Sequence, residues 1–212
     1  MTMDKKYALV ASAIKKSGRI ALCIHQFPDG DAIGSMIGLA LVLKKMGKEP
    51  MLFCPGELPH RYRFLPLYGE IKSSTSGPEK FDLAIAIDCA SSAQLAQLYP
   101  QIFKEAKLTI EIDHHVFRQT FADIALIERK AAAVGEIIYH LALQLKIKID
   151  KNTAAAILLS IIVETGSFRF PSVTLKTFDI CAHLLSCGVD YQRLAEKSYW
   201  SRSKAEALLL GL

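Results

Sequence analysis

The chain has 212 residues, of which 51% are hydrophobic and 22% are charged, and its formal net charge is +5. This balance predicts a folded core and excludes an intrinsically disordered chain. The excess of 26 basic over 21 acidic residues suits an anionic substrate, but it is too small and too dispersed to indicate a nucleic-acid-binding surface.

Helix-like and strand-like segments alternate from the start of the chain. Residues 4–18 have the pattern of a helix that stops at Gly18. Residues 19–25 (RIALCIH) form a nearly continuous apolar run, which is typical of a strand covered on both faces. A second helix is expected over residues 32–47 and a second short strand over residues 50–55.

The same alternation continues through the rest of the sequence. Further strands are predicted over residues 81–88, 107–115 and 121–128. Further helices are predicted over residues 131–145, 152–166 and 174–188, with two more over residues 190–212. Strands that alternate with helices predict an α/β fold in which a parallel β-sheet is sandwiched by helices.

The cysteines and the apolar runs bear on the compartment. The five cysteines are odd in number and no two have the spacing of a zinc knuckle, which predicts buried, reduced thiols. The longest apolar stretches, residues 32–43 and 153–163, are shorter than the ~18 residues that a membrane-spanning helix needs. We therefore expect a cytoplasmic protein that has no membrane partner.

Acidic and imidazole side chains follow three of the predicted strands. They are His25, Asp29 and Asp31 after the first strand, Asp88 after the third, and Asp113, His114 and His115 after the fourth. In open parallel sheets, ligands bind outside the carboxyl ends of the strands. If these strands are neighbours, the side chains converge on one edge of the sheet and form a binding site.

Carboxylates that converge in this way need a counter-charge. Two unit negative charges ~4 Å apart repel each other by about 4 kcal/mol at an effective dielectric constant of about 20. Either the pKa values rise strongly, or cations bind among the carboxylates. The interleaved histidines favour cations, because imidazole and carboxylate together suit Mn, Fe, Zn or Co. The oxygen-rich ligand set makes manganese a better candidate than zinc.

Each motif taken alone also has a purely structural interpretation. Residues 28–31 (PDGD) are an ordinary turn sequence, and Asp88 could cap a helix. The adjacent pair His114 and His115 is harder to explain structurally, because successive side chains point in different directions and need two partners. The remaining histidines are interpreted as structural: His60, His140 and His183.

In these motifs the sequence resembles the DHH family of phosphoesterases. The triplet that names the family stands at residues 113–115, and the motif H-x-x-P-D-G-D-A-x-G-S is matched over residues 25–35. The isolated aspartate after a strand is matched by Asp88, and the motif D-T-G-x-F is matched by residues 164–168 (ETGSF). The resemblance runs from about residue 15 to about residue 190.

The resemblance implies a site for two divalent metal ions, with manganese as the expected metal. The ligands that it implies are His25 and Asp29 for one ion, Asp31, His114 and Glu164 for the other, and Asp88 as a bridge between them. The metals would lower the pKa of a shared water molecule and neutralise phosphoryl oxygens.

Further roles follow from the same resemblance. Asp113 is expected to orient a ligand histidine, and His115 to contact the scissile phosphate or protonate the leaving oxygen. Arg169 is a candidate phosphate clamp and Arg118 is a weaker one. An exposed arginine with no ligand role is the alternative for both, and it is the interpretation that we prefer for Arg118.

Within the family, the sequence looks most like the small bacterial enzymes that degrade very short oligoribonucleotides and dephosphorylate pAp; some relatives cleave the linear dinucleotide from cyclic di-AMP. Family II pyrophosphatases normally carry Thr where Gly30 stands, and RecJ-type exonucleases are normally longer. We therefore expect a metal-dependent phosphoesterase that hydrolyses short RNA or DNA oligonucleotides or small nucleoside phosphates.

Two departures from the family pattern leave one alternative open, a non-catalytic nucleotide-binding protein with impaired turnover. Glu164 stands where the family normally has Asp, and the extra methylene displaces the carboxylate by about 1.5 Å. The glycine-rich motif of the usual second domain is also missing. We expect a catalytic domain over residues 1–190 and a helical linker toward an absent domain over residues 191–212, whose apolar helix could pair with a second copy to form a homodimer.

Overall fold

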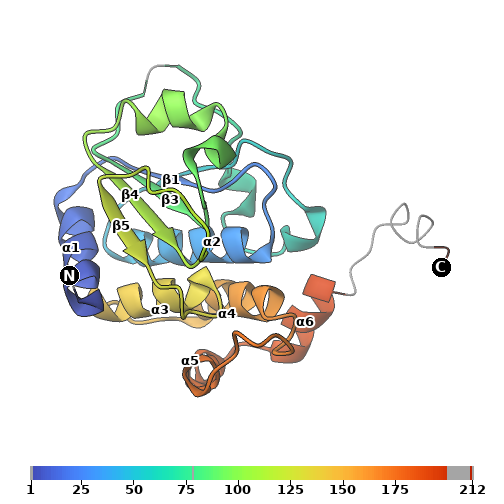
Figure 1. Ribbon diagram of the computed structural model, residues 1–212. Coiled ribbons are helices and arrows are strands. Elements are labelled where there is room, and N and C mark those ends of the chain that lie inside the picture. Colours follow the sequence, from blue (N-terminus) through green and yellow to red (C-terminus); the bar gives the residue numbers. More distant parts are fainter. Residues whose placement is uncertain (1, 78, 200–210, 212) are drawn as a thin grey trace.

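A parallel β-sheet forms the centre of the fold (Figure 1). The computed structural model describes residues 2–77, 79–199 and 211. The strands are β1 (Ile20–Cys23), β2 (Met51–Phe53), β3 (Leu83–Ile87), β4 (Thr109–Asp113) and β5 (Ile124–Ile127). They are ordered β2-β1-β3-β4-β5, and every pair of neighbours is parallel. All residues of β1, β3 and β4 are buried, as the continuous apolar runs of β1 and β3 predict, and in β4 the buried residues include Glu111 and Asp113.

Helices pack mainly on one face of this sheet. They are α1 (Met3–Lys16), α2 (Gly30–Lys45), α3 (Val134–Gln144), α4 (Lys151–Glu164), α5 (Leu175–Ser186) and α6 (Tyr191–Tyr199). In Figure 1, α2 lies next to the sheet, α3 and α4 lie below α2, and α5 lies outside them; α3 also contacts the sheet at β4. No helix in the described part of the chain has both the length and the apolar character that crossing a membrane requires.

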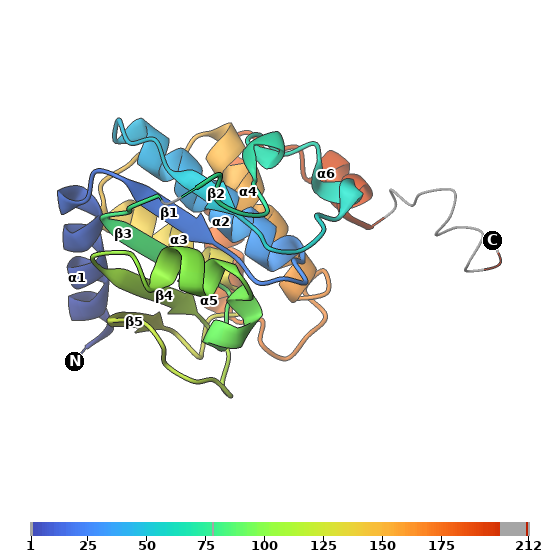
Figure 2. The same ribbon diagram turned by 90° about the horizontal axis from the view of Figure 1, so that it is seen from above.

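The opposite face of the sheet is covered by two short helical segments, η3 (Ser92–Leu95) and η4 (Tyr99–Phe103). Figure 2 shows them over β3 and β4. Two further short segments, η1 (His60–Tyr62) and η2 (Tyr68–Glu70), lie in the connection from β2 to β3. On this face β1 and β3 present small residues, namely Ala21, Cys23, Ala84 and Ala86, and β2 adds Phe53, whereas leucine and isoleucine face the α-helical layers.

The predicted α/β fold with a parallel sheet between helices is therefore confirmed, with shorter helices than expected on one face. Of the two helices expected after residue 190, α6 is observed, and the other falls on residues outside the described part of the chain. The expectation that a terminal apolar helix pairs with a second copy also falls on residues outside the described part of the chain.

The strand order places a switch point between β1 and β3. Strand β2 lies on one side of β1. Strands β3, β4 and β5 lie on the other side. In sheets with this order, the connections on the two sides separate at the switch point and leave a crevice at the carboxyl ends of the strands. The motifs at His25, Asp88 and His114 follow the adjacent strands β1, β3 and β4, so the fold brings them to one edge.

Close packing of α2 against α4 fixes the layer beneath that edge. A Cβ atom on Gly34 would lie 2.5 Å from the carbonyl oxygen of Ala156 and 2.9 Å from the backbone nitrogen of Ser160. Because these neighbours are backbone atoms, no side-chain rotation can relieve the contact. The absence of a side chain at Gly34 therefore sets the distance between the two helices.

We predict that Gly34→Ala destabilises the protein by about 1–3 kcal/mol, because it forces a methyl group into this backbone contact. Gly38→Ala in the same helix is the matched control: its Cβ would meet the side chain of Ile157 at 2.9 Å, with nothing else closer than 3.7 Å. Both changes gain the same helix propensity, so the difference in the free energy of unfolding in urea isolates the contact. Equal stabilities for the two variants would contradict this account.

Candidate metal centre

The loop after β1 supplies two of the predicted ligands. Asp29 is the N-cap of α2, and its Oδ1 accepts hydrogen bonds from the N–H groups of Asp31 (2.9 Å) and Ala32 (3.0 Å). The N-terminus of the helix stabilises a carboxylate at this position. Potential ligand atoms of His25, Asp29 and Asp88 lie within 4.8 Å of one another, and His25 Nε2 is 3.6 Å from Asp88 Oδ2. These three residues form one candidate subsite.

Asp31 is fully buried in the first turn of α2 and is held by contacts with two other helices. Its Oδ1 accepts hydrogen bonds from the hydroxyls of Ser160 (2.6 Å) and Ser35 (3.0 Å), and its Oδ2 accepts one from the N–H of Val134 (2.9 Å). Burial raises the pKa of Asp31, and His114 and these hydrogen bonds partly oppose that rise. The side chain is thus fixed before any ligand arrives.

His114 is oriented as a ligand. Its Nδ1 lies 3.1 Å from the carbonyl oxygen of Ala131, which makes Nδ1 the donor and leaves the lone pair on Nε2. That Nε2 is buried and has no hydrogen-bond partner among the described residues. Its carboxylate neighbours are Asp31 Oδ2 at 3.7 Å, Glu164 Oε1 at 3.7 Å and Asp88 Oδ1 at 3.9 Å.

These separations fit a bound cation. Two atoms that each lie ~2.1 Å from one ion are at most about 4.2 Å apart. The distances of 3.7 to 3.9 Å around His114 Nε2 are too long for hydrogen bonds, yet within this limit. The longer side chain of Glu164, where the family normally has Asp, still reaches this group, because its Oε1 lies 3.7 Å from His114 Nε2.

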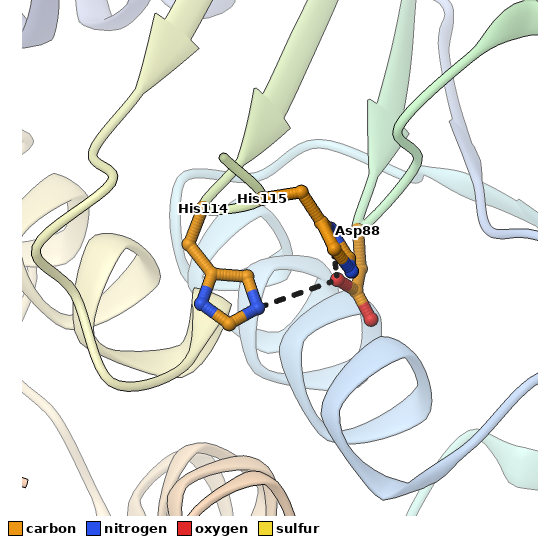
Figure 3. A group of neighbouring side chains, drawn as sticks. All are labelled: Asp88, His114 and His115. Carbon is orange, nitrogen blue, oxygen red and sulfur yellow. Dashed lines mark ion pairs between the residues drawn. The ribbon is translucent and has the colours of Figure 1, made fainter. Parts of the chain in front are cut away.

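Asp88 lies between the two groups of ligands, directly after β3. Figure 3 shows it facing His114 and His115, while its Oδ2 faces His25 on the other side. Its backbone φ is +59°, in the left-handed region that a residue with a side chain rarely adopts. Such strain persists where the surrounding structure enforces it, commonly at functional sites.

Without a bound cation, burial and mutual repulsion disfavour the ionised form of the carboxylates in this site. Burial and the nearby charges of Asp31 and Asp29 raise the pKa of Asp88 well above its usual value. Burial, followed by the charge of Asp31, raises the pKa of Glu164 to about 7. Asp88 Oδ1 is buried without a hydrogen-bond partner among the described residues. A divalent cation would remove this penalty, so the residues present fit a metal centre.

A second network lies beneath His115. Asp113 Oδ1 is 2.7 Å from His115 Nδ1 and accepts a hydrogen bond from the N–H of His114 (2.8 Å). Arg118 donates to Asp113 Oδ2 (2.9 Å) and pairs with Glu111 Oε2 (2.7 Å). Burial opposes ionisation of Asp113, but its hydrogen bonds with His115 and Arg118 hold its pKa at about 2. The bond to Asp113 is the main cause that raises the pKa of His115 to about 9.

Two expectations differ from this arrangement. The ring that Asp113 contacts is that of His115, whereas the ring of His114 is held by the carbonyl of Ala131. The preferred interpretation of Arg118 as an exposed arginine was wrong, since its side chain is 4% exposed and neutralises two buried carboxylates.

Arg169 lies in the exposed part of the loop after α4, five residues beyond Glu164. Its Nε donates a hydrogen bond to the carbonyl oxygen of Gly166 (2.5 Å). The phosphate-clamp role of Arg169 stays a prediction.

Several supporting residues were missed in the sequence. Ser160 is the one polar residue in the apolar run over residues 154–163, and Glu111 is a charge between the two isoleucines of β4. Both are signals of a buried partner. The carbonyl of Ala131 has no sequence signal, because any residue supplies a backbone oxygen.

Comparison with known proteins identifies the class. Residues 19–161 match the DHH family, N-terminal domain, and the chain therefore belongs to the DHH family of phosphoesterases, as its motifs predicted.

The chain is similar to the bifunctional oligoribonuclease and PAP phosphatase NrnA of Thermus thermophilus, with 30% identity over 194 residues that cover 91% of this chain and 58% of that protein. It is 28% identical to NrnA of Bacillus subtilis over 183 residues, 85% of this chain and 56% of that protein. The chain thus spans a little over half the length of these relatives.

A solved structure shows the same fold. It is an exopolyphosphatase-related protein from Bacteroides fragilis, with a TM-score of 0.91 and 22% identity, and the match covers 98% of this chain and 64% of that one. This agreement confirms the fold class predicted from the sequence.

We predict that Arg118→Met destabilises the protein by about 3–5 kcal/mol, because it leaves the carboxylates of Glu111 and Asp113 buried without their counter-charge. Urea unfolding at neutral pH measures the loss. The double variant Glu111→Gln, Arg118→Met should recover part of it, since one of the two uncompensated charges is then gone. Exposed ion pairs contribute up to about 1 kcal/mol. If the free energy of unfolding of Arg118→Met lies within that limit of the wild-type value, the buried pair is not important for stability.

Proposed function

We propose that this chain is the catalytic domain of a metal-dependent phosphoesterase that hydrolyses short oligonucleotides or small nucleoside phosphates. The observation that supports the proposal is the position of Asp88 at the switch point of the sheet, where it groups with His25 and Asp29 on one side and with His114 and His115 on the other. The printed activity of the NrnA relatives supports the substrate class.

The ligand set fits two divalent ions, and its mixture of carboxylate oxygen and imidazole nitrogen favours Mn²⁺. The residues that would hold them are His25 and Asp29 on one side, Asp31, His114 and Glu164 on the other, and Asp88 on both. When bound, such ions neutralise phosphoryl oxygens and lower the pKa of a water molecule toward neutrality.

The protein's own residues supply positioning and a proton. His115 is half-exposed at the rim, with its Nδ1 held by Asp113. The hydrogen bond to Asp113 raises the pKa of His115 and so favours the protonated ring, which can stabilise the charge of a phosphate and donate a proton to the leaving oxygen. Asp113 keeps the ring in place and Arg118 keeps Asp113 ionised, so both act through His115. Arg169, on the loop after α4, would contact a phosphate at the rim.

Turnover is favoured over the non-catalytic alternative by the position of Glu164. That alternative rested partly on Glu164 replacing the usual Asp, but the Glu164 carboxylate lies as close to His114 Nε2 as that of Asp31 does. The replacement therefore keeps an oxygen ligand in place.

The domain organisation is part of the same proposal. We assign catalysis to residues 1–190 and a connecting role to residues 191–212, since the NrnA relatives are longer than this chain. Within that connection, α6 packs on the domain: Leu194 is buried, and the Tyr199 hydroxyl donates to the carbonyl of Ile162 (2.7 Å).

We predict Mn²⁺-dependent release of nucleoside monophosphate from a dinucleotide, with different losses for two variants. His115→Gln should lower kcat by about 10²–10⁴-fold and leave bound manganese unchanged, because it removes a proton donor and no ligand. Asp88→Asn should lose both activity and manganese. Kinetics combined with elemental analysis of the purified proteins separate the two effects.

Two results would count against this proposal. If His115→Gln loses its manganese, His115 is a ligand and its assignment is wrong. If the wild-type chain holds two manganese ions and still releases no nucleotide at high enzyme concentration, the non-catalytic alternative is favoured.

A further inference from the structure

An exposed aromatic side chain stands beside the candidate metal centre. Phe117, two residues after His115, is 93% exposed, and its neighbour Val116 is 56% exposed. Both lie on the loop that follows β4. Exposed apolar side chains grouped beside a polar site commonly mark a surface that binds a ligand.

This loop lines an open depression of the surface with a volume of about 530 Å³, which we call the loop cavity. The residues that line it are Ala90, Ser91, Val116, Phe117, Arg118 and Gln119. The first two lie on the loop after β3, and the N–H of Gln119 joins the loops by donating to the carbonyl of Ala90 (2.9 Å). Because Asp88 begins one loop and His114 begins the other, this loop cavity adjoins the candidate metal centre.

We infer that the loop cavity is a subsite for a nucleobase, which stacks on the ring of Phe117 while its phosphate lies at the metal centre. The inference rests on the proposed function and deepens it, because it assigns the substrate a base close to the scissile phosphate. The volume lies within the range of small-molecule sites, and a flat aromatic face accepts any base. Ser91 and Gln119 add polar groups for the edge of the base.

The charge of the lining argues against a second phosphate as the occupant. Arg118 is the only cationic residue among those lining the cavity, and its guanidinium is already paired with the carboxylates of Glu111 and Asp113. The cavity therefore offers an anion little free positive charge. An uncharged, planar group matches its exposed aromatic face better.

The chain offers a matched comparison for Phe117. Phe27, on the loop after β1, is 80% exposed, but it lies outside the residues that line the loop cavity. Both phenylalanines are exposed and close in sequence to predicted ligands, but only Phe117 lines the loop cavity. A base that binds in the loop cavity depends on Phe117 and not on Phe27.

The test compares the binding of adenosine 5′-monophosphate and ribose 5-phosphate by calorimetry in the presence of Mn²⁺. Ribose 5-phosphate reports the phosphate site of the proposed function, and the extra affinity of the nucleotide reports the base subsite. In the wild type, we expect the nucleotide to bind about tenfold more tightly, a difference of ~1.4 kcal/mol. Phe117→Ala should abolish that difference without weakening ribose 5-phosphate, whereas Phe117→Tyr and Phe27→Ala should retain it.

The outcomes separate the two proposals. Equal affinities of the wild type for the two compounds, or a loss of the difference in Phe27→Ala with none in Phe117→Ala, would overturn the base subsite and leave the phosphoesterase proposal standing. If neither compound binds, the phosphate site fails, and the subsite that depends on it fails too.

Discussion

The carboxylate of Asp88 lies buried between two groups of predicted metal ligands, and the rest of the site is arranged around it. Its Oδ2 faces His25, and its Oδ1 faces His114 without a hydrogen bond from any described residue. Burial and nearby acids raise its pKa, and its backbone adopts a left-handed conformation. Each of these features costs free energy in the bare protein. A pair of divalent cations would offset the cost of the buried, unpaired carboxylate, which explains why a fold would keep it.

The fold and the site depend on each other through the layer of helices beneath the sheet edge. The strand order makes β1, β3 and β4 neighbours, so that residues from distant parts of the sequence meet. Asp31 reaches this edge from α2, but α4 holds its carboxylate through the hydroxyl of Ser160, and α3 does so through the N–H of Val134. The close approach of α2 and α4 at Gly34 makes the hydrogen bond to Ser160 geometrically possible. Packing beneath the sheet thus orients a side chain at its edge.

Local patterns in the sequence were sufficient for the strands, the helices and the convergence of the motifs, because continuous apolar runs followed by acids specify buried parallel strands. They were insufficient for contacts between side chains far apart in the chain. Arg118 follows β4 in a loop, so its local sequence predicts an exposed side chain. Its partner Glu111 lies seven residues earlier, on the face of β4 opposite the isoleucines, and local patterns do not reveal that contact. The orientation of His114 depends on a backbone carbonyl seventeen residues away, which no local pattern encodes.

The central claim is that cations replace the missing counter-charge around Asp88. Anomalous diffraction from crystals grown with Mn²⁺ tests it most directly, because the metal peaks locate the ions independently of any activity. The account predicts two peaks in contact with the Asp88 carboxylate, one near His25 and the other near His114. Well-ordered crystals with no peak at this edge of the sheet, or with manganese bound only elsewhere on the protein, would contradict it.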